Sequence, residues 1–354
     1  MNSNSVAENF ATYHEIVTQT DAWQGALTAV ANQTPALRKL WRNGNYSNIV
    51  FTGCGSTYYL SLAAAALGQT TMGIPAKGVP GGELYLYPQA TYVPAALGRT
   101  LLVAISRSGT TTETVVAAEN FKKHERGDVI VITNYGESPL AQGADVAIAI
   151  PEGQEVSVAQ TRSFSSMYVA VTALIMTLAG REELLTSMAG LPAVGQKLIT
   201  QFATLARTLG RNLDLDRFYF LGSGPRYGLA CEVNLKMKEM TLTHSEPFHF
   251  FEFRHGPMSM VTESAAVIGL LSDENRARET AVLQEMAELG GLTFSLAEND
   301  ADVSFKSGLP EAVRNVLYLP ILQLVAYFRS TSKGLNPDRP SNLTAVVELD
   351  LLTN

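Results

Sequence analysis

The sequence predicts an α/β fold that contains two similar doubly wound parallel sheets. Short apolar runs rich in β-branched residues, typical of strands buried on both faces, alternate with helical patterns. Several of these runs end at glycine and hydroxyl residues that precede a helix. The same series of strands and turns also occurs twice along the chain, which is typical of a duplicated domain.

The composition is that of a large globular protein. The chain has 354 residues, of which 46% are hydrophobic and 17% are charged, so it can bury a substantial core. A net charge of −7 without a basic run argues against nucleic-acid binding. The sequence has neither an apolar stretch long enough for a membrane span nor the order of a signal peptide at its start. Cys54 and Cys231 have no metal-type spacing, and we expect a cytoplasmic protein without disulfides.

The first half of the chain begins with helices and continues with strands. Residues 5–41 have a helical pattern. The run NIVFTGCGSTYY (48–59) predicts a strand, a Gly-x-Gly turn and a helix. LLVAISRSGTTTET (101–114) predicts a second strand, a hydroxyl-rich turn and another helix, and DVIVITN (128–134) predicts a third strand.

The second half repeats this series after a helical linker rich in Ala, Leu and Met. RFYFLGSGPRYG (217–228), AAVIGLLSDEN (265–275) and GLTFSLA (291–297) match the three earlier runs in order, at an offset of roughly 170 residues. We therefore expect five segments. They are an N-terminal helical segment, a first domain, a helical linker, a second domain and a tail that contributes to the site, at 1–46, 47–162, 163–209, 210–335 and 336–354.

Two turns of the first half predict an anion site. Loops that follow neighbouring parallel strands meet at one edge of the sheet, so residues 53–57 and 106–112 should lie side by side. Backbone N–H groups and hydroxyls can surround a phosphate there without a lysine, and Arg107 can add charge-assisted hydrogen bonds. The alternative is that either loop, taken alone, only makes a turn. Neither loop has the full pattern of a nucleoside-triphosphate loop or a dinucleotide fingerprint.

A helix predicted over 227–242 has three charged residues in the middle of its apolar face. Glu232, Lys236 and Glu239 are spaced i, i+4 and i+7, and at about 100° per residue the last two fall within about 40° of Glu232. Charges on an apolar face are costly unless they are paired or functional. The alternative is an exposed ion pair, which contributes only a few tenths of a kcal/mol. The polar face, opposite, has Asn234, Lys238 and Thr241.

Three of the chain's five histidines follow this helix: His244, His249 and His255. A zinc site is one interpretation, but the spacing and the interspersed glutamates match no compact ligand pattern. Acid–base chemistry fits better, because carboxylates and imidazoles can exchange protons near neutrality. His244 or His249 alone is also compatible with a structural histidine. The sequence RHGP predicts that a turn presents His255.

These motifs resemble those of the sugar isomerase (SIS) family, and within it the isomerase domains of glutamine–fructose-6-phosphate aminotransferases. The resemblance covers nearly the whole chain and follows the family's order. It implies an isomerase or isomerising deaminase that acts on a hexose or hexosamine 6-phosphate by C1–C2 proton transfer through an enediol or enediolamine, without a metal or organic cofactor. It rests on EIVTQTDAW, GCGSTYY, ISRSGTTTET, GQEVSVAQTRSF, LGSGPRYGLACEVNLKMKE, EFRHGP and PDRPSNL.

The resemblance also implies which residues form the site. Glu239 resembles the base that moves the proton, Lys236 its companion, and His255 the residue that opens the sugar ring. The family's histidine loop reaches across a dimer interface, which implies a homodimer. The residues implied to hold the phosphate are Ser56, Thr57, Ser106, Arg107, Ser108 and Thr111. Those implied to contact the rest of the substrate are Cys54, Gly55, Val158 and Glu232.

The chain departs from the family's pattern in three places. No glutaminase domain precedes the isomerase part, so we do not expect ammonia transfer from glutamine. Ala345 stands where the family's synthases have a lysine that forms a Schiff base with the ketose, so imine formation through a lysine is not expected. Arg107 stands where the family often has glutamine. Two alternatives stay open: a deglycase that splits 6-phosphorylated fructosamines, and a sugar-phosphate sensor without catalysis.

Overall fold

The computed structural model describes residues 9–92, 98–346 and 349, and it divides into two compact units. The unit that we call the N unit contains the described residues within 21–154, 162–189 and 344–354. The C unit contains those within 1–20, 155–161 and 190–343. Each unit holds one five-stranded parallel sheet, so the predicted fold class of two similar doubly wound sheets is confirmed.

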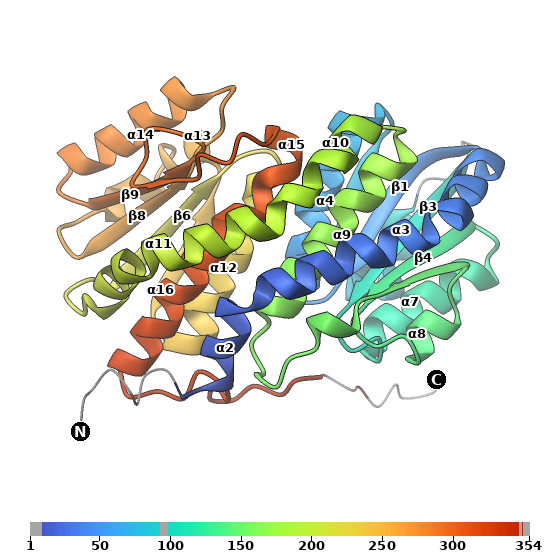
Figure 1. Cartoon of the computed structure of the whole chain (residues 1–354), viewed down its shortest axis with the longest axis horizontal. Helices are drawn as coiled ribbons and strands as arrows, with labels where there is room; N and C mark the ends of the chain where they lie inside the picture. Colours follow the sequence, from blue (N-terminus) through green and yellow to red (C-terminus); the bar gives the residue numbers. More distant parts are fainter. Residues whose placement is uncertain (1–8, 93–97, 347–348, 350–354) are drawn as a thin grey trace. The chain divides into compact units, whose positions relative to one another are not determined.

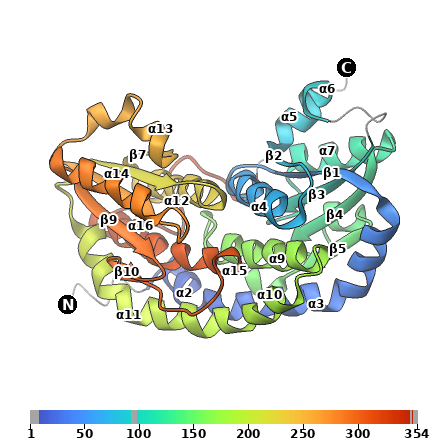
Figure 2. The same cartoon turned by 90° about the horizontal axis from the view of Figure 1, so that it is seen from above.

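The N unit has the strand order β2-β1-β3-β4-β5 (Figure 1). Its strands are β1 (Tyr46–Gly53), β2 (Ala76–Pro80), β3 (Arg99–Ser106), β4 (Gly127–Thr133) and β5 (Val146–Ala149). Figure 2 shows α4 and α9 on one face of this sheet and α7 on the other. Its helices are α3 (Gln19–Gly44), α4 (Ser56–Met72), α5 (Gly81–Leu86), α6 (Pro88–Thr91), α7 (Thr112–Lys123), α8 (Pro139–Gln142), η2 (Pro151–Gly153), α9 (Arg162–Leu178), α10 (Glu182–Ser187) and η3 (Met188–Gly190).

The C unit has the strand order β10-β9-β8-β6-β7. Its strands are β6 (Arg217–Gly222), β7 (His244–Phe248), β8 (Ala265–Leu270), β9 (Leu292–Ala297) and β10 (Val303–Ser304). Its helices are α2 (Ala11–Val17), α11 (Leu191–Arg211), α12 (Pro225–Thr241), α13 (Phe250–Phe253), η4 (Pro257–Met260), α14 (Arg276–Glu288), α15 (Glu311–Arg314), η5 (Asn315–Tyr318) and α16 (Leu319–Ser332).

The two sheets confirm the predicted repeat. The three strands predicted in the first half are β1, β3 and β4, and their counterparts are β6, β8 and β9. Read from β7 to β10, the second sheet has the same order as the first. Residues 5–8 of the predicted N-terminal helix lie outside the described residues, and the described part is broken at Thr18 into α2 and α3.

The helices predicted as a linker are divided between the two units. Helix α9 packs on α4 in the N unit, and α11 packs on α16 in the C unit. Every residue of α9 from Ser163 to Leu178 is buried. A helix that is apolar on all sides needs neighbours on all sides, which is why α9 belongs to the core of the N unit. The units are therefore discontinuous in sequence, whereas we predicted continuous segments.

The strand order brings two loops of the N unit together, as predicted. Strands β1 and β3 are neighbours, with Thr52 paired to Ala104, and the chain leaves them toward opposite sides of the sheet. The loops that follow them meet at the carboxyl edge, where such sheets bind ligands. The first turn requires a glycine, because a Cβ on Gly53 would lie 2.4 Å from Thr57 Oγ1.

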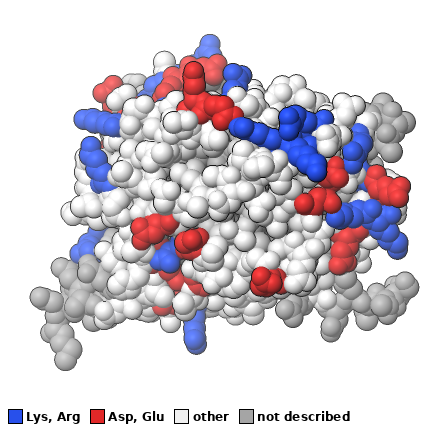
Figure 3. Space-filling model, turned by 45° about the vertical axis from the view of Figure 1, so that its right-hand side comes forward, with Lys and Arg blue, Asp and Glu red and all other residues white. Residues whose placement is uncertain are grey.

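In the described part of the chain, no helix combines the length and the apolar character that a bilayer crossing requires. Figure 3 shows acidic and basic side chains interspersed on the face in view.

Gly109 controls the geometry of the loop after β3. Its φ is 66°, and a Cβ there would lie 2.0 Å from Ser138 Oγ. We expect Gly109→Ala to lower the free energy of unfolding by about 1–3 kcal/mol, through backbone strain and overpacking. Urea denaturation measures this change. Gly82→Ala is the control, because no heavy atom lies within 4 Å of its added Cβ. Equal unfolding free energies for the two variants would contradict this account.

Candidate functional site

The loop after β3 presents hydroxyl groups in a fixed arrangement. Ser106 Oγ accepts a hydrogen bond from Gly109 N at 3.1 Å. Ser108 Oγ accepts from Thr110 N at 3.2 Å and from Thr110 Oγ1 at 3.0 Å. Thr111 is the N-cap residue of α7, and its side chain accepts no hydrogen bond from the N–H groups of the first helical turn. These groups and the positive end of the helix dipole favour an anion.

A basic side chain and the C-terminal tail meet at this loop. Arg107 is 9% exposed, and its Nη2 donates to the Ala345 carbonyl at 2.7 Å. The Arg107 carbonyl in turn accepts from Thr133 Oγ1 and from Asn134 N, both at 3.1 Å. The guanidinium charge is therefore held at the loop. Ala345, which we expect at the position of the family's Schiff-base lysine, contributes the carbonyl that accepts from Arg107.

The turn after β1 is closed by its own side chains. Thr57 Oγ1 donates to the Cys54 carbonyl and accepts from Cys54 N, each at 2.9 Å. Ser56 and Thr57 are buried, and Gly55 has a φ of 57°. Burial raises the pKa of the Cys54 thiol, so the cysteine is a neutral neighbour of the anion site rather than a thiolate nucleophile.

In the C unit, the three charges of α12 form a buried cluster. Lys236 Nζ lies 2.6 Å from Glu239 Oε2 and 3.4 Å from Glu232 Oε1. The side chains of Lys236 and Glu232 are 1% and 0% exposed, whereas that of Glu239 is 19% exposed. The charges are thus paired and buried, unlike the exposed pair of the alternative interpretation. Glu239 is the member of this cluster that solvent or a substrate can reach.

The face of α12 that we predicted as polar is also largely covered. Asn234 is 3% and Thr241 is 0% exposed. The helix packs against β6, β7 and α16, and Ser245 Oγ of β7 donates to the Asn234 carbonyl at 3.2 Å. The Thr241 hydroxyl is satisfied within the helix, because it donates to the Met237 carbonyl.

The electrostatics of the cluster keep its cation charged. Burial by itself lowers the pKa of Lys236, but the carboxylates of Glu232 and Glu239 outweigh it, and the net pKa is raised. Glu155 contributes in the same direction. The Lys236 ammonium lies 2.6 Å from Glu239 Oε2, so the ion pair holds in place a side chain of the type that serves as a general base.

The segment that carries Glu155 is tied to both ends of the chain. Glu15 Oε1 accepts from Val156 N at 2.5 Å, and Val158 N donates to the Asp338 carbonyl at 3.0 Å. The Asp338 carboxylate accepts from Thr12 N at 2.8 Å. The motif GQEVSVAQTRSF therefore forms hydrogen bonds with both EIVTQTDAW and PDRPSNL. In the sequence, these three motifs contributed only to the family resemblance. We had assigned no role to Glu15, Glu155 or Asp338.

A cavity of about 240 Å³ adjoins the cluster. It is lined by Glu239 at the end of α12 and by the segment around PDRPSNL, including Asn336, Arg339 and Ser341. A polar cavity with donors and acceptors suits a hydroxylated ligand. We had not predicted Arg339 as a site residue. The only indication in the sequence was its place in the family motif PDRPSNL.

The three histidines differ in their surroundings. A turn presents His255, as predicted, and within the described chain its exposed imidazole makes no hydrogen bond. His249 stacks on Tyr227 with ring centroids 3.9 Å apart, and exposed His244 lies 3.7 Å from Glu246. Among the residues that the structure describes, no group of three or more His, Cys, Asp or Glu side chains is arranged to hold a metal.

The predicted site residues thus fall into two sets. The N unit holds Cys54, Gly55 and the six residues expected to bind phosphate. The C unit brings together Glu232, Lys236 and Glu239, and it contains Val158 and His255. In the C unit, no hydrogen bond or ion pair of the described residues joins His255 to Lys236 or Glu239.

Comparisons with known proteins show which family the chain belongs to. The chain is 28% identical over 321 residues to glutamine–fructose-6-phosphate aminotransferase [isomerizing] of Pseudomonas putida, covering 86% of this chain and 52% of the relative. The chain thus spans about half the length of the curated relatives it matches. Glucosamine-6-phosphate deaminase of Thermotoga maritima has a TM-score of 0.74 at 27% identity, covering 92% of this chain and all of the other.

A tagatose-6-phosphate ketose/aldose isomerase of Escherichia coli shares the fold, with a TM-score of 0.84 at 23% identity over 95% of this chain and 96% of that chain. A family model for the SIS domain matches residues 45–177 and 214–306. These ranges include both sheets, the loop after β3 and the charged helix α12. The chain therefore belongs to the SIS domain family, whose members among its relatives are phosphosugar isomerases and deaminases.

Proposed function

We propose that the protein is an isomerase or isomerising deaminase of a hexose or hexosamine 6-phosphate. The observation that carries this proposal is the buried cluster of α12, in which a charged lysine holds one accessible carboxylate, Glu239. An aldose–ketose shift needs a single base that can serve two adjacent carbons. The loop after β3 supplies the second requirement, an anion site for the 6-phosphate.

In this proposal the phosphate is bound by the N unit. The hydroxyls of Ser106, Ser108 and Thr111 and the N-terminus of α7 donate to its oxygens, and Arg107 supplies a positive charge. Ser56 and Thr57 lie on the neighbouring loop. Holding the phosphate immobilises the sugar, which lowers the entropic cost of its reaction.

The proton transfer is assigned to the C unit. Glu239 removes the proton from C2 of the aldose, the C–H electron pair forms a C1–C2 double bond, and the carbonyl oxygen gains a proton. Glu239 then returns its proton to C1, while the C2 hydroxyl loses its proton to solvent in place of the one that the carbonyl oxygen gained, and C2 becomes the carbonyl. Lys236 holds the Glu239 side chain in place through their ion pair, and His255 is assigned the proton transfer that opens the ring.

The fate of nitrogen depends on the substrate. With a hexosamine 6-phosphate, the shift produces an imine at C2, which water hydrolyses to the ketose and ammonia. The methyl group of Ala345 cannot form an imine with the ketose, so no step through a lysine at that position is proposed. Release of a larger amine instead would favour the deglycase, and binding without proton exchange would favour the sensor. We also propose that the protein is cytoplasmic and that it forms a homodimer. Light scattering tests the oligomeric state.

We expect Glu239→Gln to lower kcat at least about 100-fold, because the amide cannot accept the proton. The assay measures ketose and ammonium formed from a panel of hexose and hexosamine 6-phosphates. Glu246→Gln is the matched control in the same unit, since this carboxylate is 42% exposed and pairs only with His244 at 3.7 Å. Full turnover by Glu239→Gln would remove the assigned role.

We expect Ser108→Ala to raise KM for the phosphosugar about tenfold to a hundredfold with little change in kcat, because a hydrogen bond to a charged group is lost. Steady-state kinetics measure both constants. Thr70→Ala, which removes an exposed hydroxyl from α4, should leave KM unchanged. An unchanged KM for Ser108→Ala would place the phosphate elsewhere.

A further inference from the structure

The C unit contains a counterpart of the phosphate loop. Strand β8 has the same place in the second sheet that β3 has in the first, between the counterparts of β1 and β4. The loop after β8 (residues 271–275) leads into α14, as the loop after β3 leads into α7. Both loops therefore lie at the carboxyl edge of a sheet, where the strand order changes direction.

The two loops share an internal hydrogen bond. Ser272 Oγ accepts from Asn275 N at 3.0 Å, just as Ser106 Oγ accepts from Gly109 N at 3.1 Å. Each bond joins a buried serine to the backbone three residues later. The turn that positions an anion in the N unit is thus also present in the C unit.

The two loops differ in what occupies the anion position. In the C unit, Oε2 of Glu279 accepts from Ser272 N at 2.6 Å and from Ser272 Oγ at 3.0 Å. Glu279 lies in the first turns of α14 and is 3% exposed. In the N unit, Glu113 lies in the first turn of α7, but within the described chain it makes no hydrogen bond to the loop after β3.

Other charges near the C-unit loop are paired as well. Glu311 Oε1 accepts from Asp273 N at 3.2 Å and from Arg226 Nη1 at 2.6 Å. Arg314, which is 3% exposed, pairs with Asp273 and with Glu298. The two buried arginines close to this loop therefore have carboxylate partners, so they do not add an unpaired positive charge for a phosphate.

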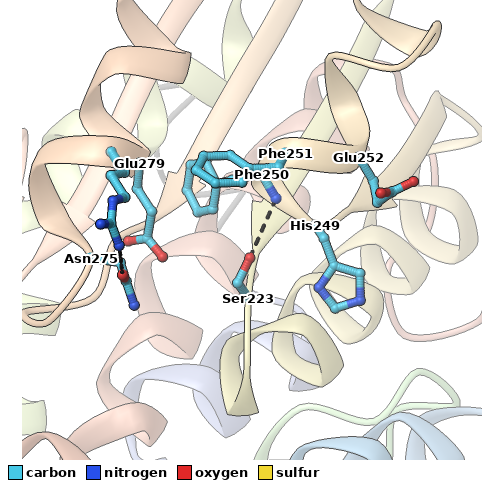
Figure 4. A pocket seen from close by; sticks show the side chains of 8 residues that line it. Ser223, His249, Phe250, Phe251, Glu252, Asn275 and Glu279 are labelled. Atoms are coloured by element: carbon cyan, nitrogen blue, oxygen red, sulfur yellow. Dashed lines mark hydrogen bonds between the residues drawn. The ribbon is translucent and has the colours of Figure 1, made fainter.

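Space beside the C-unit loop is nevertheless available. A cavity of about 360 Å³ is lined by Ser223, His249, Asn275 and Glu279, among others. Figure 4 shows Glu279 and Asn275 on one side of this cavity and Ser223 and His249 toward the other. Ser223 Oγ accepts from Phe250 N at 3.4 Å (Figure 4). The cavity beside the loop is empty of side chains, but the Glu279 carboxylate occupies the position on the Ser272 donors where an anion would bind.

We propose that Glu279 is a built-in ligand of a second phosphate-type loop. Its carboxylate takes the hydrogen bonds that a phosphate would take, and it closes the C-unit loop to phosphorylated ligands. Each chain then binds one phosphate, at the loop after β3. The single phosphate per chain rests on the proposed function, whereas the role of Glu279 depends only on contacts within the C unit.

Counting the sites for inorganic phosphate on the full chain by isothermal titration and phosphorus NMR tests this inference. We expect one site in the native protein and two in Glu279→Ala, because the truncation frees the Ser272 donors and leaves room beside them. Adding Ser272→Ala to Glu279→Ala should return the count to one. Glu279→Gln keeps a side-chain oxygen of the same reach, and it should behave as the native protein.

The outcomes separate this inference from the proposed function. Two sites in the native protein, or no added site in Glu279→Ala, would overturn the role of Glu279. No site in the native protein but one in Glu279→Ala would support it, and would instead remove the N-unit loop from the proposed function. If Glu279→Ala does not fold, Glu279→Ser replaces it, since the shorter serine also frees the Ser272 donors and keeps a polar group at this position.

Discussion

The buried contact of Lys236 with Glu232 and Glu239 is the interaction on which the rest of the C unit depends. Charges within one helix can be buried only if each has a partner of opposite sign, and removing one partner of such a pair typically costs about 3–5 kcal/mol. The contact therefore requires the spacing i, i+4, i+7 and a helix that is covered by β6, β7 and α16. Burying these charges lowers stability, and buried charged groups of this kind cluster at functional sites. We therefore assign the proton transfer to this cluster.

The same reasoning explains how the two halves of the duplication differ. Both halves keep a parallel sheet, a Gly-x-Gly turn and a serine that closes the next loop. In the N unit the loop presents hydroxyls and Arg107 to an external anion. In the C unit, Glu279 satisfies the corresponding loop internally, and α12 carries charges that its counterpart α4 lacks. Under the proposed function, a single fold thus provides binding in one half and acid–base chemistry in the other.

Local patterns predicted three strands of each sheet, the repeat, the loop after β3 and the charged face of α12, because each depends on residues close in sequence. The pairing of β1 with β3 followed from the rules of parallel sheets. Contacts between distant segments left no such pattern. The hydrogen bonds of Glu15 and Asp338, the burial of Asn234 and the discontinuous units all depend on residues that are far apart in sequence, so they appear only in the folded chain.

The central claim is that this chain moves a proton between C1 and C2 of a phosphosugar. Proton NMR in deuterated water, with the pure protein and a panel of hexose and hexosamine 6-phosphates, tests it most directly. We expect deuterium to enter C1 or C2 of at least one of these sugars, and the sugar that exchanges is then the substrate. Saturable binding of these sugars without exchange at either carbon would contradict it and would make the protein a sensor.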